Sequence, residues 1–297
     1  MNLETLLTEQ ANPASALIDT VSTLEMLRII NEEDKRVALA VEAELPQIAL
    51  AVDAIVAGME AGGRLFYTGA GTSGRLGVLD ASECPPTYNV SPELVQGFIA
   101  GGDKALRKAV EGAEDSRELG AEEMMAMGFC GADMLCGIAA SGRTPYVLGA
   151  MAKAKELGAL TIAVSCSPGS ELSGAADIAI EVLPGPEVVT GSTRMKAGTA
   201  TKLVLNMLST GALIRLGYVY GNLMVNVQPT NEKLVDRAIR IVMQAVGVER
   251  EAASELFESS GRVVRTAIVM GRLKLDREEA ERRLSLAGNR ISVAIQT

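Results

Sequence analysis

The central part of the chain alternates short apolar runs with segments of helical periodicity. The apolar runs are Arg64–Thr68, Leu94–Ala100, Asp133–Ala140, Ala159–Cys166 and Asp177–Val182. The helical patterns between and after them are Gly74–Glu83, Lys104–Met127, Pro145–Leu157 and Thr193–Leu216. Continuous apolar strands separated by helices are typical of a parallel sheet that helices cover on both faces. The pattern therefore predicts an α/β fold with a parallel five-stranded sheet.

Helical periodicity without strands marks both ends of the chain. Ser22–Ile30 has helical spacing, Asn31–Lys35 interrupts it, and a longer helical segment runs over Val37–Ala61 with Pro46 as a restart point. After about Thr230 the helices are short, charged and amphipathic: Asn231–Gly247, Val248–Ser259, Arg262–Arg272 and Asp276–Ser285. We therefore expect an N-terminal helical segment over 1–50, a central domain over 51–228 and a small helical C-terminal subdomain over 229–297.

The composition is that of a globular protein, with 48% hydrophobic and 22% charged residues among 297. The chain has no histidine. This excludes Ser-His-Asp and Cys-His nucleophile systems, histidine-ligated metal sites and imidazole as acid or base. Proton transfer near neutral pH is left to carboxylates, or to Lys, Tyr or Cys with a shifted pKa.

Charge and hydropathy limit the kinds of partner that we expect for this protein. The net charge is −9 and Lys and Arg form no cluster, which argues against a nucleic-acid partner. The longest uncharged apolar stretch, Leu203–Ile214, is shorter than the roughly 18 residues that suggest a membrane span. No secretory leader is evident, and the four cysteines form no CxxC pair. We expect a cytoplasmic protein without a membrane partner.

Three turns after predicted strands combine glycine with hydroxyl groups: Gly69–Gly74, Ser141–Thr144 and Ser165–Ser170. The segment Gly69–Gly74 matches G-x-G-x-x-G, but the acidic residue that a dinucleotide site needs at the end of the next strand is missing, because Asp103 comes too late. The segment instead carries Thr72 and Ser73 at the start of a helix.

The second turn contains Ser141, Gly142 and Thr144. A helix N-terminus attracts anions, so two such turns could bind the phosphate of a small metabolite. The alternative is that these hydroxyl groups only cap helices. The residues by themselves leave both interpretations open.

Longer blocks resemble one family. Residues 69–87, GAGTSGRLGVLDASECPPT, look like the sugar-isomerase (SIS) domain of the N-acetylmuramic acid 6-phosphate etherases. Val110–Ser116 and Gly137–Tyr146 match as well, and Gly191–Thr199 is also similar to a block of the related glucokinase regulatory proteins. The resemblance covers nearly the whole chain and thins after about Gly247.

The resemblance implies a three-layer αβα SIS domain and a reaction. Family members cleave the D-lactyl ether at C3 of N-acetylmuramic acid 6-phosphate, giving N-acetylglucosamine 6-phosphate and D-lactate. They act in the recycling of cell-wall sugars in the bacterial cytoplasm. They are homodimers that use neither a metal nor a nucleotide cofactor.

The family's pattern places the acid–base pair at Glu83 and Glu114. Glu83 is expected to donate the proton to the departing lactate, and Glu114 is expected to remove the C2 proton. Glu83 precedes Cys84-Pro-Pro86, where its helix should end, and the negative end of a helix favours a protonated carboxyl group. Glu114 should lie near the start of the helix that runs to Met127, where ionisation is favoured.

Several interpretations remain open beside this one. Glu111, Glu114, Asp115 and Glu118 have helical spacing and could simply form a solvated face. Arg75 and Arg143 are candidate phosphate ligands that could instead pair with acidic side chains. Lys196 is a further candidate ligand, and it could reach the site of a partner subunit. The protein could also be a non-catalytic sugar-phosphate sensor, a phosphosugar isomerase, or a nicotinamide-dependent enzyme that uses the glycine-rich turn.

Overall fold

The computed structural model describes residues 7–296, which form two compact units. The first unit contains the chain up to Ser82 together with Pro92–Ser209. The second contains Glu83–Ser91 and the chain from Thr210 on. The N-terminal helices therefore belong to the same unit as the sheet.

The first unit is built on a five-stranded sheet in which every neighbouring pair is parallel, which confirms the predicted fold class. The strand order is β2-β1-β3-β4-β5. Each strand falls within or beside a predicted apolar run, since full burial on both faces requires uninterrupted apolar sequence. The strands are β1 (Leu65–Gly69), β2 (Val95–Ile99), β3 (Met134–Ile138), β4 (Leu160–Ser165) and β5 (Ile178–Glu181).

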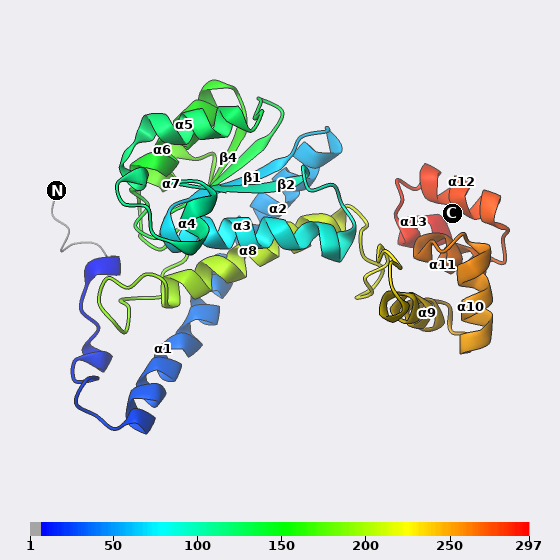
Figure 1. The fold of residues 1–297 in the computed structure, drawn as a ribbon, viewed down its shortest axis with the longest axis horizontal. Coiled ribbons are helices and arrows are strands. Elements are labelled where there is room, and N and C mark those ends of the chain that lie inside the picture. Colours follow the sequence, from blue (N-terminus) through cyan, green and yellow to red (C-terminus); the bar gives the residue numbers. More distant parts are fainter. Residues whose placement is uncertain (1–6, 297) are drawn as a thin grey trace. The chain divides into compact units, whose positions relative to one another are not determined.

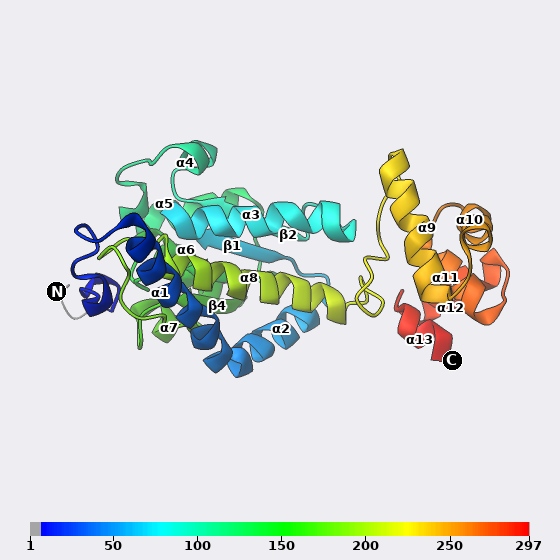
Figure 2. The same ribbon diagram turned by 90° about the horizontal axis from the view of Figure 1, so that it is seen from below.

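Helices cover both faces of this sheet, which gives the expected three layers (Figures 1 and 2). One face carries α5 (Arg117–Ala126), α6 (Pro145–Glu156) and α7 (Glu171–Ala175). The core on that face joins Phe66 and Leu135 of the sheet to side chains of α6. The other face carries α2 (Leu45–Glu60), α3 (Gly71–Tyr88) and α8 (Lys196–Arg215).

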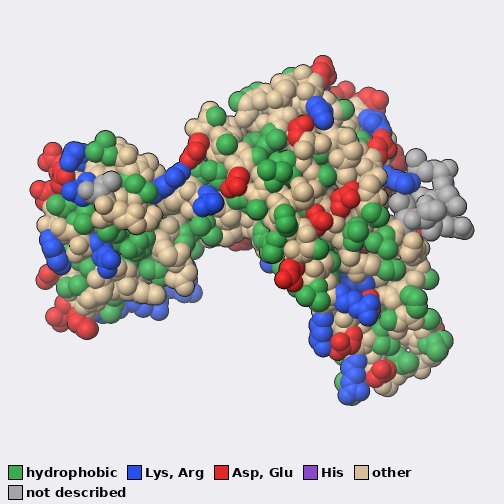
Figure 3. Space-filling model, turned by 180° about the vertical axis from the view of Figure 1, so that it is seen from behind, with side chains coloured by type: hydrophobic (Ala, Val, Ile, Leu, Met, Phe, Trp, Pro, Cys, Tyr) green, Lys and Arg blue, Asp and Glu red, His purple; other side chains and the backbone are tan. Residues whose placement is uncertain are grey.

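Helix α1 (Thr23–Ala43) is continuous, so the predicted interruption at Asn31–Lys35 is wrong. Glu32, Glu33 and Lys35 are good helix formers, and Lys35 forms an i,i+3 ion pair with Glu32. Acidic and basic side chains lie interspersed on the face of the molecule in Figure 3. The predicted restart at Pro46 is confirmed, because Pro46 occupies the first turn of α2.

Helix α3 does not end at Glu83 but continues through Pro85 and Pro86 to Tyr88, so the predicted end of the helix is wrong. An interior proline costs about 3 kcal/mol because it removes a hydrogen bond and crowds a carbonyl group. Packing within the second unit offsets this cost. Cys84 and Tyr88 are buried there, and Asn226 donates a hydrogen bond to the Tyr88 carbonyl group at 2.9 Å.

The predicted helix Lys104–Met127 is wrong, because the chain forms three separate pieces. They are α4 (Asp103–Arg107), the 3-10 helix η4 (Ala113–Asp115) and α5. Lys108 is extended and Gly112 has a left-handed φ of 74°, so the helix cannot continue between them. The acidic side chains at 111–118 therefore share no helical face.

The second unit is helical around a core of its own, which contains Val242, Phe257 and Ile268. Its helices are α9 (Glu232–Val246), α10 (Arg250–Ser259), α11 (Val264–Leu273), α12 (Arg277–Leu286) and α13 (Ile291–Gln296). The first four match the predicted pattern, and α13 was not predicted. Within the described residues, the 3-10 helices η2 (Leu7–Glu9) and η3 (Pro13–Ser15) precede α1 in the first unit. No helix in residues 7–296 has the length and apolar character needed to cross a membrane.

Candidate active site

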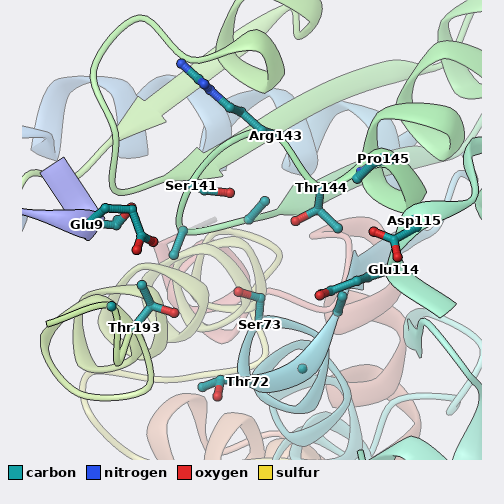
Figure 4. Close-up of a pocket in the computed structure, with 16 residues that line it drawn as sticks. Glu9, Thr72, Ser73, Glu114, Asp115, Ser141, Arg143, Thr144, Pro145 and Thr193 are labelled. Atoms are coloured by element: carbon teal, nitrogen blue, oxygen red, sulfur yellow. The ribbon is translucent and has the colours of Figure 1, made fainter. Parts of the chain in front are cut away.

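A cavity of about 370 Å³ opens where the segments that follow β1 and β3 meet (Figure 4). These two strands are neighbours, and the order of the sheet reverses between them, since β2 follows β1 in the chain but lies on its other side. In doubly wound sheets ligands bind at this switch point, outside the carboxyl ends of the strands. The topology therefore selects this cavity as the candidate site.

One wall of the cavity is the N-terminus of α3, with Thr72 and Ser73. A close approach of two glycines places the helix there: a Cβ on Gly74 would stand 2.5 Å from the Gly69 carbonyl oxygen. The Gly74 N–H is already bonded to the Ala70 carbonyl group at 3.3 Å, whereas the N–H groups before it precede the first helical bond. Free N–H groups and the helix dipole suit an anion.

The second wall follows β3 and contains Ser141 and Thr144. Gly142 closes the turn with φ +63° and donates its N–H to the Ala139 carbonyl group at 2.9 Å, but it does not line the cavity. Thr144 is at the N-cap position of α6, yet its side chain makes no capping hydrogen bond. The interpretation of Thr144 as a helix cap and nothing more is therefore wrong.

Glu114 and Asp115 lie on a third wall, carried by η4 (Figure 4). A backbone contact between α5 and α6 fixes this wall: a Cβ on Gly149 would stand 1.9 Å from the Arg117 carbonyl oxygen, and one on Gly120 would stand 2.0 Å from that of Tyr146. Arg117 follows Glu114 closely and Tyr146 follows Thr144, so the crossing of the two helices brings Glu114 to the turns on the first two walls of the cavity. We call these turns, which carry Thr72, Ser73, Ser141 and Thr144, the hydroxyl turns.

Glu83 is exposed and is not among the described residues that line the cavity. It lies twelve residues after Gly71 in α3, roughly 18 Å along the helix axis. Since α3 continues to Tyr88, Glu83 is outside the last turn, and the expected influence of the helix end on its charge loses its basis. Within a single chain, Glu114 therefore lines the cavity with the hydroxyl turns and Glu83 does not.

Of the three candidate cations, Arg143 lines the cavity. Arg75 instead donates hydrogen bonds to the carbonyl groups of Ala105 and Leu106 at 2.7 and 3.1 Å. Lys196 is 1% exposed, and its Nζ lies 2.6 Å from a carboxylate oxygen of buried Glu33. Neither Arg75 nor Lys196 is brought to the cavity.

Sequence reasoning missed part of the lining. Thr8 and Glu9 come from η2, and Gly191 and Thr193 come from the segment before α8. The resemblance singled out the block Gly191–Thr199, but the candidate ligand within it was Lys196 and not Gly191 or Thr193. No local pattern marks Glu9, since an exposed acidic residue near a chain end is common.

Buried polar groups form hydrogen bonds on both faces of the sheet. Tyr146, next to the Thr144 turn, donates a hydrogen bond to Glu123, and burial together with this carboxylate raises the pKa of its phenol. On the opposite face of the sheet, burial raises the pKa of Asp80, which accepts a hydrogen bond from Asn206 at 2.6 Å. Within the described residues, no group of three or more Cys, Asp or Glu could hold a metal ion.

Comparison with known proteins agrees with this architecture. Residues 47–155 match the glucokinase regulatory protein N-terminal SIS domain, and residues 118–211 match the SIS domain. The chain is also similar in structure to an E. coli CFT073 protein solved with a bound ligand, with a TM-score of 0.50 and 15% identity, over 68% of this chain and 97% of that one. This likeness supports the fold.

Relatives of high identity cover almost the whole chain. The N-acetylmuramic acid 6-phosphate etherase of Aeromonas hydrophila is 59% identical over 292 residues, 98% of each chain. The etherase of Aliivibrio fischeri strain ES114 is 59% identical over 285 residues, 96% of this chain and 95% of its own.

Proposed function

The chain belongs to the N-acetylmuramic acid 6-phosphate etherase family, and from this premise we propose how its residues carry out the reaction. It is a carbon–oxygen lyase that cleaves the D-lactyl ether of N-acetylmuramic acid 6-phosphate, with N-acetylglucosamine 6-phosphate and D-lactate as products. Neither a sugar-phosphate sensor nor a phosphosugar isomerase is favoured by relatives of this identity.

The chemistry needs an acid and a base, because an alkoxide is a poor leaving group. Opening of the sugar ring exposes the C1 aldehyde and acidifies the proton on C2. A base removes this proton while an acid protonates the departing lactate oxygen, and water then adds at C3 of the unsaturated aldehyde. In a chain without histidine, two carboxyl groups in opposite protonation states can carry both proton transfers.

Glu114 is the base at C2. The observation that carries this assignment is that Glu114 lines the same cavity as Thr72, Ser73, Ser141 and Thr144. The phosphate group binds at the N-terminus of α3 and at the hydroxyl turns, where free N–H groups favour an anion. Glu114 comes two residues before Ser116, the N-cap of α5, so it lies beside the N-terminus of that helix.

Glu83 is the proton donor, and a second copy of the chain supplies it. This follows because the cavity of one chain contains Glu114 without Glu83, whereas Glu83 is exposed and free to approach another subunit. The active form is then a homodimer whose two sites each use both copies. The enzyme acts in the cytoplasm, where sugars recovered from the cell wall are recycled.

Release of D-lactate from N-acetylmuramic acid 6-phosphate tests the function. The purified protein should release D-lactate and N-acetylglucosamine 6-phosphate in equal amounts, with and without a chelator. Sugar isomerisation without lactate would show that the protein is an isomerase. Tight binding of the substrate without any turnover would show that it is a sensor.

A further inference from the structure

Glu9 lines a wall of the cavity that takes no part in the proposed proton transfers. It ends η2 and lines the cavity together with Thr8. Figure 4 shows its carboxylate directed into the cavity near Thr193, on the opposite side from Glu114. The neighbouring loop lies close beside it, since a Cβ on Gly191 would stand only 3.3 Å from a Glu9 carboxylate oxygen, a tight contact.

The segment that carries Glu9, residues 8–15, is anchored to the first unit by buried hydrogen bonds, and we name it the strap. Asn12 Nδ2 donates to the Glu33 carboxylate at 2.8 Å and to the Pro186 carbonyl group at 3.0 Å. Ser15 Oγ donates to the Val188 carbonyl group at 2.8 Å. The strap is thereby fixed to the same loop that brings Gly191 and Thr193 to the cavity.

A buried ion pair completes this anchor. Glu33 and Lys196 are 2% and 1% exposed, and the distance from Lys196 Nζ to the Glu33 carboxylate is 2.6 Å. Burial alone would raise the pKa of Glu33, but the hydrogen bonds from Lys196 and Asn12 outweigh it and lower the pKa. Glu187 accepts the backbone N–H groups of Lys196 and Ala197 at 2.8 and 2.9 Å, which ties the loop to the start of α8.

We propose that Glu9 is a substrate-contacting residue whose carboxylate accepts hydrogen bonds from hydroxyl groups of the sugar, and that Asn12 is a positioning residue that holds it there. This inference rests on the proposed function, which supplies a phosphorylated sugar as ligand. A carboxylate repels a phosphate group and can only accept hydrogen bonds, so it must face the neutral part of the substrate. With the phosphate at α3, the hydroxyl groups at C4 and C5 of the open sugar are left for Glu9.

Equilibrium binding tests the contact without turnover. The probes are N-acetylglucosamine 6-phosphate and inorganic phosphate, measured by calorimetry on the Glu9→Ala and Glu9→Gln variants. A hydrogen bond to a charged group is worth more than the roughly 1.4 kcal/mol that equals a tenfold change. We therefore expect Glu9→Ala to weaken binding of the sugar phosphate at least about tenfold and Glu9→Gln less.

Binding of inorganic phosphate to these variants should be unchanged or slightly tighter. The exposed neighbour Gln10, which does not line the cavity, provides the control variant Gln10→Ala. If Glu9→Ala leaves sugar-phosphate affinity unchanged, or weakens both probes equally, the proposed contact is wrong. This readout is independent of lactate release, so a protein that binds through Glu9 but releases no lactate would contradict only the proposed function.

The role of Asn12 is tested by a double-mutant cycle. Asn12→Ala should raise KM for the etherase reaction more than it lowers kcat, because it displaces a binding group. If the strap acts through Glu9, Glu9→Ala should cost clearly less in kcat/KM in the Asn12→Ala background than in the wild type. Additive costs would show that Asn12 does not position Glu9.

Discussion

At the scale of single residues, we propose that carboxylates carry out the proton transfers, because the chain has no histidine. The three acidic side chains on the cavity differ in what surrounds them. Glu114 and Asp115 lie on η4 before the N-terminus of α5, while Glu9 lies on the strap across the cavity. The position of each side chain relative to the hydroxyl turns determines what it does. In our proposal, Glu114 removes a proton and Glu9 binds the substrate.

The division of roles between the two glutamates predicts different partial reactions. Glu83→Ala should lose lactate release but still exchange the C2 hydrogen of the substrate with solvent deuterium, because the base is intact. Glu114→Ala should lose the exchange as well. Deuterium incorporation followed by mass spectrometry or NMR measures this, and the reverse pattern would mean that the acid and the base are interchanged.

The ion pair of Asp133 with Arg64 predicts a pH-dependent contribution to stability. Asp133 is 2% exposed and accepts hydrogen bonds from the Arg64 backbone, its guanidinium group and the Cys130 N–H at 2.7–3.0 Å. Burial would raise its pKa, but these donors hold it below the ordinary value. A carboxyl group whose pKa is lower in the folded than in the unfolded state stabilises the fold at pH values above its unfolded-state pKa. This stabilisation is lost as the pH falls through its folded-state pKa.

Asp133→Asn should therefore lower the free energy of unfolding at pH 7 by about 1.5–3 kcal/mol. The difference from the wild type should shrink as the pH falls through the acid range, in which Asp133 of the wild type becomes protonated. Denaturant unfolding at a series of pH values measures it. The exposed Asp236, paired with Arg250, gives the control Asp236→Asn, which should hardly change stability because water screens such pairs. Equal losses in the two variants would contradict the argument.

At the scale of secondary-structure elements, helix crossings set the shape of the cavity. Helices α5 and α6 contact each other backbone against backbone at Gly120 and Gly149. Any side chain at these positions would push the helices apart. Because η4 lies directly before α5, such a shift would move Glu114 away from Thr144.

Gly149→Ala should accordingly lower both stability and activity. Overpacking of this kind costs about 1–3 kcal/mol, and a displaced base reduces kcat. Thermal unfolding and the lactate assay measure the two effects. A Cβ on Gly174 in α7 would meet no neighbouring atom within 4 Å, so Gly174→Ala should leave both unchanged or slightly raise stability. A Gly149→Ala variant with wild-type stability and kcat would show that the α5–α6 crossing does not hold Glu114 in place.

At the scale of the whole molecule, the proposed active site needs a second copy of the chain. If each site combines Glu114 of one copy with Glu83 of the other, two inactive variants should complement each other. Mixing Glu83→Ala with Glu114→Ala under exchange conditions produces heterodimers with one intact and one doubly defective site. Random pairing makes half of the dimers mixed, so roughly a quarter of the wild-type activity should return.

Native mass spectrometry would establish that the mixed dimers have formed, and each variant mixed with itself provides the control. Mixed dimers without lactate release would show that both glutamates act from the same copy. A protein that is monomeric at the concentrations of the assay would contradict the shared site directly.

The sequence by itself determined the elements and the hydroxyl turns. Five strands, the helix restart at Pro46 and the positions of Thr72, Ser73, Ser141 and Thr144 follow from hydrophobic periodicity and local turn chemistry. These signals lie within a few residues of the structure they specify, so no distant contact is needed to interpret them.

Only the tertiary structure decided which distant side chains share the cavity. The strap brings Glu9 to it through hydrogen bonds of Asn12 and Ser15 to residues 174 and 173 positions away. Lys196 is kept from it by its ion pair with Glu33, 163 positions away. Helix α3 passes Pro85 and Pro86 because burial in the second unit outweighs the local cost. In each case the free energy of long-range packing overrides the local preference, and no local pattern in the sequence records that energy.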